Sequence, residues 1–173
     1  ISNTVLLTCQ SNRFIDNSTN AFTITKNGDT RVSAFGPFTE TDTTTGSGYF
    51  GSTGDNLRVA TITALGSGDF TIECWIYPIS FANYRVIWDN RTSDPDASGI
   101  AFGLDANAKV YAYTNNGFAM TTTTALISNH WTHISLVRNG AGSGNLKIYI
   151  NGQADVTTAT ITANISRTSV YIG

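Results

Sequence analysis

The segment from His130 to Gln153, HWTHISLVRNGAGSGNLKIYINGQ, constrains the possible folds more than any other part of the chain. Its two runs, WTHISLVR and LKIYIN, place apolar side chains at every second position, which is the period of a β-strand. Asn151-Gly152 ends the second run, and this pair is typical of a tight hairpin because both central residues of a type I′ turn need a positive φ. The segment therefore predicts two paired antiparallel strands followed by a hairpin turn.

His130 and His133 lie three residues apart in the first of these strands. Two nearby histidines suggest a metal or catalytic site, but side chains three positions apart in a strand point to opposite faces of the sheet. The two imidazoles are not expected to converge on one ion. We interpret both histidines as part of the scaffold.

Composition extends the β prediction to the whole chain of 173 residues. Charged residues, among them the helix formers Glu and Lys, make up only 13%, whereas the 16 glycines suit turns. Short strand-like runs follow one another at the spacing of a sandwich, so the predicted fold class is all-β, with two antiparallel sheets. We predict strands within residues 3–10, 21–29, 68–78, 100–105 and 109–114, and an exposed loop at 39–48.

Charge and hydropathy exclude several classes of function. The net charge is −2 without a basic run, so no nucleic-acid partner is expected. No apolar stretch approaches the roughly 20 residues of a membrane-spanning helix, so no membrane insertion is expected. A glycosidase needs two carboxylates across a cleft, and the two glutamates, Glu40 and Glu73, are far apart in the sequence. We therefore expect no enzyme activity.

Cysteine and tryptophan residues are interpreted as structural. Cys9 and Cys74 both lie in strand-like runs. A bridge between them is one alternative, and two separate buried thiols are the alternative we favour. The tryptophans are expected in the core; they are Trp75, Trp88 and Trp131.

Four motifs carry a resemblance to a known family. The segments YFGSTGDNLRV, FTIECWIYP, HWTHISLVRNG…LKIYINGQ and the terminal VYIG occur in the order found in laminin G-like domains. The chain from Tyr49 to Gly173 thus resembles the concanavalin A-like lectin/glucanase superfamily. The stretch VLLTCQSNRFIDNS…FTITKNGD…SAFGPF resembles segments that precede such domains in virion proteins of tailed bacteriophages.

The resemblance implies a jelly-roll β-sandwich on a virion or another extracellular surface. We expect residues 1–173 to form a single sandwich domain, with N-terminal strands and a loop at 1–48 and the laminin G-like region at 49–173. Family members usually continue past IG with one more strand, and the chain begins at Ile1 rather than Met. We therefore expect it to be a fragment of a longer chain.

The loop WDNRTSDPDASG is a candidate calcium site. Calcium binds several oxygen ligands from Asp, Asn and backbone carbonyls on a flexible loop. The candidate ligands within eight positions are Asp89, Asn90, Asp94 and Asp96. The alternative is a solvated loop, because Asp and Asn are also the ordinary residues of turns.

The strand that follows is a candidate sugar-binding surface. Sugars stack on aromatic rings and hydrogen-bond to planar polar groups. Tyr111 and Tyr113 share one face of the predicted strand, and Asn115 and Asn116 follow it. If Val110 and Ala112 face the core, the tyrosines point outward; the alternative places them in the core or against a neighbouring chain.

These observations predict a non-catalytic recognition module that binds carbohydrate, with calcium as its one candidate cofactor. The alternative is a purely structural virion protein, such as a decoration, fibre or spike element, that acts through protein contacts. The expected partners are accordingly a glycan or neighbouring virion proteins, with a homo-oligomer as a further possibility.

Overall fold

A computed structural model describes residues 3–9, 11–38, 45–114 and 117–173. Over these ranges the chain forms thirteen strands and no helix, which confirms the all-β prediction. With no helix in the described ranges, none is present that is long and apolar enough to cross a membrane. The chain divides into two compact units: the first comprises Ile1–Thr63 with Thr168–Gly173, and the second comprises Ala64–Arg167.

The first unit contains a three-stranded antiparallel sheet and a separate two-stranded hairpin. The sheet has the order β1 (Ile24–Asn27), β4 (Asn56–Val59), β13 (Val170–Ile172), and the hairpin joins β2 (Arg31–Ser33) to β3 (Ser47–Tyr49). Leu57, Val59 and Val170 are fully buried in the sheet. The predicted turn at Asn27-Gly28 is present, with a φ of 65° at Gly28. A Cβ at Gly28 would clash with the carboxylate of Asp55, so only glycine fits this turn.

The strand predicted at residues 3–10 is wrong for the part that the structure describes, since residues 3–9 contain no strand. The carboxylate of Asp16 accepts hydrogen bonds from the backbone N–H groups of Leu7, Ser18 and Phe22, so a side chain replaces the sheet partner. These bonds lower the pKa of Asp16 although burial opposes them. Cys9 has a φ of 59°, which breaks the extended backbone that a strand needs.

The loop predicted at 39–48 is partly outside the described residues, because 39–44 are not described. Its last two residues, Ser47 and Gly48, belong to β3 rather than to a loop. They pair with Ser33 and Val32 of β2. The polar composition of the segment concealed this short strand.

The second unit is built from two four-stranded antiparallel sheets. The first sheet has the order β12-β11-β10-β5. Its strands are β5 (Phe70–Ile76), β10 (Thr132–Arg138), β11 (Leu146–Ile150) and β12 (Gln153–Ale159)

. The last of these, β12, ends at Ala159. Leu136 of β10 lies between Ile72 of β5 and Ile148 of β11, and both Leu136 and Ile148 are fully buried.

The second sheet of this unit has the order β6-β7-β8-β9. Its strands are β6 (Arg85–Asp89), β7 (Ile100–Leu104), β8 (Lys109–Thr114) and β9 (Gly117–Ala125). Phe102 in the middle of β7 lies between Trp88 and Ala112 in the pairing register, and all three side chains are buried. The hairpin predicted from residues 100–105 and 109–114 is confirmed as β7 and β8, with a φ of 63° at Ala108 in the turn.

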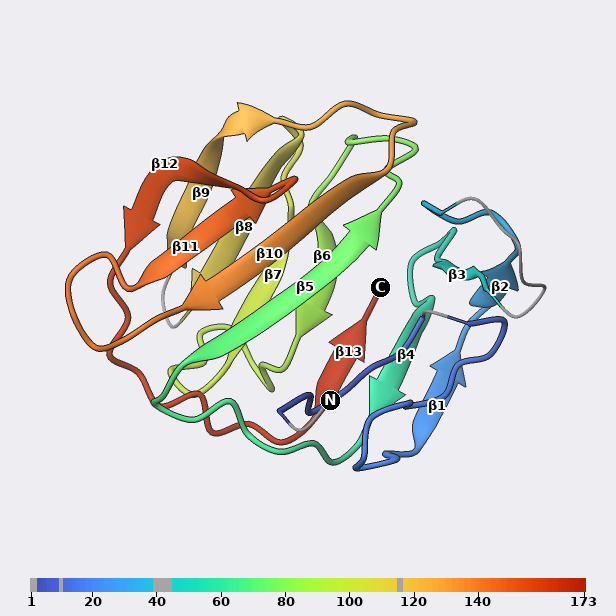
Figure 1. Ribbon diagram of the computed structural model, residues 1–173, viewed down its shortest axis with the longest axis horizontal. Coiled ribbons are helices and arrows are strands. Elements are labelled where there is room, and N and C mark those ends of the chain that lie inside the picture. Colours follow the sequence, from blue (N-terminus) through green and yellow to red (C-terminus); the bar gives the residue numbers. More distant parts are fainter. Residues whose placement is uncertain (1–2, 10, 39–44, 115–116) are drawn as a thin grey trace. The chain divides into compact units, whose positions relative to one another are not determined.

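The two sheets lie one over the other as a β-sandwich, with β5 and β10 in front of β6 and β7 in Figure 1. Asp155 links the sheets, because its carboxylate accepts hydrogen bonds from Thr123 Oγ1 at 3.0 Å and from the N–H groups of Thr123 and Thr124 at 3.1 and 3.2 Å. Burial raises the pKa of Asp155, but these bonds outweigh burial and hold it well below its usual range. The charged carboxylate therefore joins the edge strands β12 and β9.

The turn at Asn151-Gly152 joins β11 to β12 as predicted. Both residues have a positive φ, 50° at Asn151 and 78° at Gly152. Ile150 pairs with Gln153 directly across the turn, so the loop contains two residues. These are the properties of a type I′ hairpin.

We predict that Gly152→Ala lowers the free energy of unfolding by about 1–2 kcal/mol, because a side chain is disfavoured at positive φ. Urea denaturation measures the change. Gly142→Ala is the matched control, since Gly142 lacks a positive φ and an added Cβ has no neighbour within 4 Å. An equal loss of stability in both variants would contradict the prediction.

Candidate functional site

The candidate site lies on the outer face of the sheet formed by β6 to β9 and on the loop that follows β6. Val110 and Ala112 of β8 are fully buried on the core side, so Tyr111 and Tyr113 lie on the opposite face. Their partners on β7 are small: Gly103 pairs with Tyr111, and Ala101 pairs with Tyr113. The tyrosines and the aspartate loop, which the sequence treated as two candidate sites, share this face.

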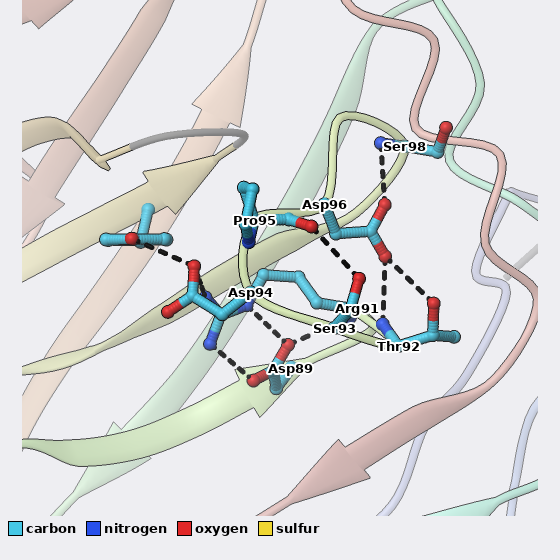
Figure 2. A network of polar contacts seen from close by, with 9 residues as sticks. Asp89, Arg91, Thr92, Ser93, Asp94, Pro95, Asp96 and Ser98 are labelled. Carbon is cyan, nitrogen blue, oxygen red and sulfur yellow. Dashed lines mark hydrogen bonds and ion pairs between the residues drawn. The ribbon is translucent and has the colours of Figure 1, made fainter.

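Arg91 holds the loop to the end of β6 (Figure 2). Its Nε and Nη2 donate to the two carboxylate oxygens of Asp89 at 3.0 and 2.8 Å, and its backbone N–H donates to the same carboxylate at 2.9 Å. The hydrogen bond to Asp89 raises the pKa of Arg91. Gly99 allows the loop to fold closely, because a Cβ there would lie 2.8 Å from Cα of Arg91.

Tyr113 and Asp94 form the exposed part of the site. The Tyr113 hydroxyl donates to Asp94 Oδ1 at 3.0 Å, and this bond raises the pKa of Tyr113. The guanidinium of Arg91 lies 4.8 Å from the centre of the Tyr113 ring and 3.8 Å from Asp94 Oδ1. The Asp94 side chain is 61% exposed, so its carboxylate faces solvent beside the aromatic ring.

Asp96 is buried and paired with a distant arginine. Nε and Nη2 of Arg167 donate to its two oxygens at 2.8 and 3.0 Å. The N–H groups of Thr92 and Ser98 donate to the same carboxylate, as Figure 2 shows. The guanidinium of Arg167 holds the pKa of Asp96 well below its usual range, with help from these N–H groups and against the effect of burial.

Asn90 is fully buried rather than exposed on the loop. Its Oδ1 accepts a hydrogen bond from the N–H of Ile100 at 2.7 Å, which ties the loop to the start of β7. Among the described residues, its Nδ2 has no hydrogen-bond partner. Asn115 and Asn116, the two other candidates for sugar binding, lie outside the described residues.

Tyr111 does not lie open on the sheet, since it is only 4% exposed. Its hydroxyl lies over Gly103, where an added Cβ would be 2.9 Å from the hydroxyl oxygen. Tyr84 packs edge-on against it, with ring centres 5.8 Å apart. Burial raises the pKa of Tyr111 to about 12. Tyr84, which the sequence analysis did not select, is 57% exposed and presents its ring at this face instead.

The four candidate calcium ligands have different partners. Asp89 binds Arg91, Asp96 binds Arg167, and Asn90 binds the backbone. In the described part of the chain, no three side chains of His, Cys, Asp or Glu are grouped so that they could hold a metal ion. Calcium binding by the loop stays a prediction.

Trp75 is a second exposed aromatic residue that the sequence analysis missed. It was expected in the core together with Trp88 and Trp131; Trp88 is buried, but Trp75 is 42% exposed. Its ring packs against His133 with ring centres 5.3 Å apart. The alternation of β5 already indicated its position, because Trp75 shares a face with Glu73 and not with the buried Ile72.

Both cysteines are free thiols, as favoured by the sequence. Neither is fully buried, and Cys9 lies in a loop instead of the predicted strand. Burial nevertheless raises the pKa of Cys9 to about 11, so its thiol stays protonated near neutral pH.

We predict that Asp96→Asn destabilises the protein by about 1.5–3 kcal/mol near neutral pH, because Arg167 loses its charged partner. The lowered pKa means that the Asp96 contribution is complete above the usual carboxyl pKa of about 3.9 and is lost as the pH falls toward the folded-state value. The difference between wild type and variant should therefore shrink at about pH 2.5.

Chemical denaturation at both pH values measures this difference. Asp29→Asn is the matched control, because Asp29 pairs with Arg31 on the surface, where the two side chains are 80% and 58% exposed. The control should change stability little at either pH. A gap between wild type and Asp96→Asn that stays constant with pH would contradict the prediction.

Three solved structures have a similar fold. The first is described as "Cell entry of botulinum neurotoxin type C is dependent upon interaction with two ganglioside molecules", with a TM-score of 0.64, 18% identity, and coverage of 97% of this chain and 42% of that chain. The binding domain of botulinum neurotoxin DC in complex with rat synaptotagmin II has a TM-score of 0.67, 18% identity and the same coverage. Domain 4 of AbnA, a GH43 extracellular arabinanase from Geobacillus stearothermophilus, in complex with arabinotriose, has a TM-score of 0.64, 15% identity, and coverage of 91% of this chain and 76% of that chain.

These identities establish a shared fold alone, and the chain spans about two fifths of the length of the toxin chains that it matches. No curated protein matches the sequence. Residues 50–173 match the laminin G family model that is described as the concanavalin A-like lectin/glucanases superfamily. This range is most of the chain and agrees with the predicted boundary at residue 49. The chain belongs to the concanavalin A-like lectin/glucanase superfamily.

Proposed function

We propose that the chain is a non-catalytic recognition module that binds carbohydrate on the outer face of the sheet formed by β6 to β9. The observation that carries the proposal is the exposed carboxylate of Asp94 beside the ring and hydroxyl of Tyr113. Tyr84 adds an exposed ring on the same face. Rings for stacking beside fixed polar groups are the combination that a sugar requires.

The charged groups of this face are positioned before a ligand arrives. Asp89 fixes the guanidinium of Arg91, and Arg91 in turn lies over Tyr113. The Asp94 carboxylate keeps an exposed oxygen that accepts hydrogen bonds from sugar hydroxyls. Binding then orders few additional side chains, which limits its entropic cost.

Similar folds support the proposal by analogy. One similar structure is a domain of an arabinanase in complex with arabinotriose, and another concerns a toxin that interacts with gangliosides. Both names connect this sandwich with sugar-containing ligands. The likeness suggests the class of ligand, and the residues that bind it are proposed from the geometry of this chain.

The carboxylates of the site favour binding over catalysis. A glycosidase needs a general acid whose pKa is raised, beside a second carboxylate. Asp96 has a lowered pKa and is paired with Arg167, and Asp89 is paired with Arg91. Neither carboxylate is suited to donate a proton to a glycosidic oxygen.

A purely structural role on a phage virion or another extracellular surface is the second candidate function. The N-terminal segment that resembles phage virion proteins includes SAFGPF. Phe35 and Phe38 of this segment are 52% and 64% exposed, and exposed aromatic residues are enriched in protein contacts. A neighbouring virion protein or a second copy of the chain is the partner in this alternative.

We predict that Tyr113→Ala and Asp94→Ala each weaken glycan binding about tenfold, because each removes one element of the site. A glycan array followed by titration with arabinotriose and with the best array ligand measures the change. Asp29→Ala removes an equally exposed carboxylate in the first unit and should leave binding unchanged. Binding that persists at full strength in both site variants would rule out this face.

Calcium binding by the Asp89–Asp96 loop has a separate test. A cation would have to displace Arg91 from Asp89 and Arg167 from Asp96, so we expect calcium and chelator to leave the melting temperature unchanged. Differential scanning fluorimetry with calcium and with chelator measures this. A rise of several degrees with calcium, absent in Asp94→Ala, would establish the site.

A further inference from the structure

The outer face of the other sheet carries a second group of aromatic and polar side chains. The alternation of β5, β10 and β11 places Trp75, His133 and Tyr149 on the side away from the buried Ile72, Leu136 and Ile148. His133 pairs with Trp75. Ser135 pairs both with Glu73 and with Tyr149. We call the residues Glu73, Trp75, His133, Lys147 and Tyr149 the outer strip.

One end of the outer strip presents an aromatic ring. Trp75 is 42% exposed, and its ring is tilted by 55° against that of His133. Nε2 of His133 lies 3.5 Å from the carboxylate of Glu73, which is itself largely exposed. An exposed indole beside a carboxylate and an imidazole offers a plate for a sugar ring and acceptors for its hydroxyls.

The other end of the outer strip opens into a depression of about 200 Å³. It is lined by Val137, Lys147 and Tyr149 together with the loop at Asn139 and Ser143–Asn145. The loop is held in place, because the N–H of Gly140 donates to Asp69 at 2.7 Å and Asn145 is anchored to Ile161. A fixed loop gives the depression a defined shape.

The chemistry of the depression favours an anion. Lys147 is the one charged residue that lines it, alongside the hydroxyls of Tyr149 and Ser143. Within the described residues, Lys147 forms no ion pair. An ammonium group surrounded by hydroxyl and amide donors matches a carboxylate or a sulfate.

We propose that the outer strip is a second glycan site that binds an acidic oligosaccharide, with one sugar ring on Trp75 and an anionic substituent at Lys147. His133 and Val137 are four residues apart on β10, and Lys147 lies one strand further, so the two ends are separated by about 15 Å. An oligosaccharide of several units spans this distance. A single sugar does not.

The surroundings of Trp75 favour a sugar over a protein partner. The centre of a protein interface is depleted of charged residues and forms a continuous apolar patch. On the outer strip, Glu73 and Lys147 are interleaved with Ser135 and Thr71, so Trp75 is not part of such a patch. This site uses no residue of the Tyr113 face, and it goes beyond the function proposed above.

Native gel electrophoresis through gels that contain a polysaccharide tests the proposal on the whole chain. Polygalacturonate and chondroitin sulfate are the acidic probes, and dextran and arabinan are the neutral ones. We expect retardation in an acidic gel, a loss of apparent affinity of about tenfold in Trp75→Ala, and substantial retention of binding in Trp75→Phe. Lys147→Gln should weaken binding to the acidic probe several-fold, and added salt should weaken wild-type binding.

Two control variants separate the site from general effects of truncation or charge. Ile127→Ala removes another exposed apolar side chain, and Lys26→Gln removes an exposed lysine from the first unit. Both should bind the acidic probes as wild type does. Circular dichroism and the melting temperature verify that each variant is folded.

Three results would overturn the proposal. They are the absence of retardation in both acidic gels, unchanged binding in folded Trp75→Ala or Lys147→Gln, and equal losses in the control variants. Tyr113→Ala distinguishes this site from the other face, because it should leave binding to the acidic probes intact. Loss of binding in Tyr113→Ala with full binding in Trp75→Ala would assign the acidic ligand to the Tyr113 face and overturn the outer strip.

Discussion

The second unit depends on the pairing of β10 with both of its neighbours. β10 pairs with β5 from Thr132 to Arg138 and with β11 from Ile134 to Arg138. Because successive side chains of a strand alternate, this register buries Ile134 and Leu136 and turns His133 outward. A slip of one residue would exchange the two faces. The pairing that builds the core therefore also aligns the outer strip.

The fold was predictable where the local pattern determines the structure. Asn151-Gly152 requires a turn with two positive φ angles, and β5 and β10 alternate without interruption, so these elements were identified correctly. The strand predicted at 3–10 failed because its apolar residues suggested a strand while a later side chain, Asp16, took the backbone N–H of Leu7. Local periodicity does not reveal a competing hydrogen-bond acceptor from elsewhere in the chain.

The candidate site was predictable in its location but not in its chemistry. The loop after β6 and the tyrosines of β8 were selected from residue types, and the structure places both on one sheet face. The charge state of the loop depends on Arg167, which is 71 residues from Asp96. Tyr111 is buried because Gly103 leaves room for its ring and Tyr84 covers it. Neither relation is visible in a local sequence pattern, so aspartates that resemble cation ligands are partners of arginines.

Asn151 has two roles in the hairpin between β11 and β12. Its N–H donates to the carbonyl oxygen of His133 at 2.8 Å, and its side-chain Oδ1 accepts the N–H of His133 at 3.0 Å. The residue that supplies the positive φ of the turn thus also fixes the backbone of a strip residue on the neighbouring strand. Glycine satisfies the turn equally well but has no side chain to hold His133. Turn stability and the geometry of this surface are consequently inherited together, and a homologue that changes Asn151 alters both.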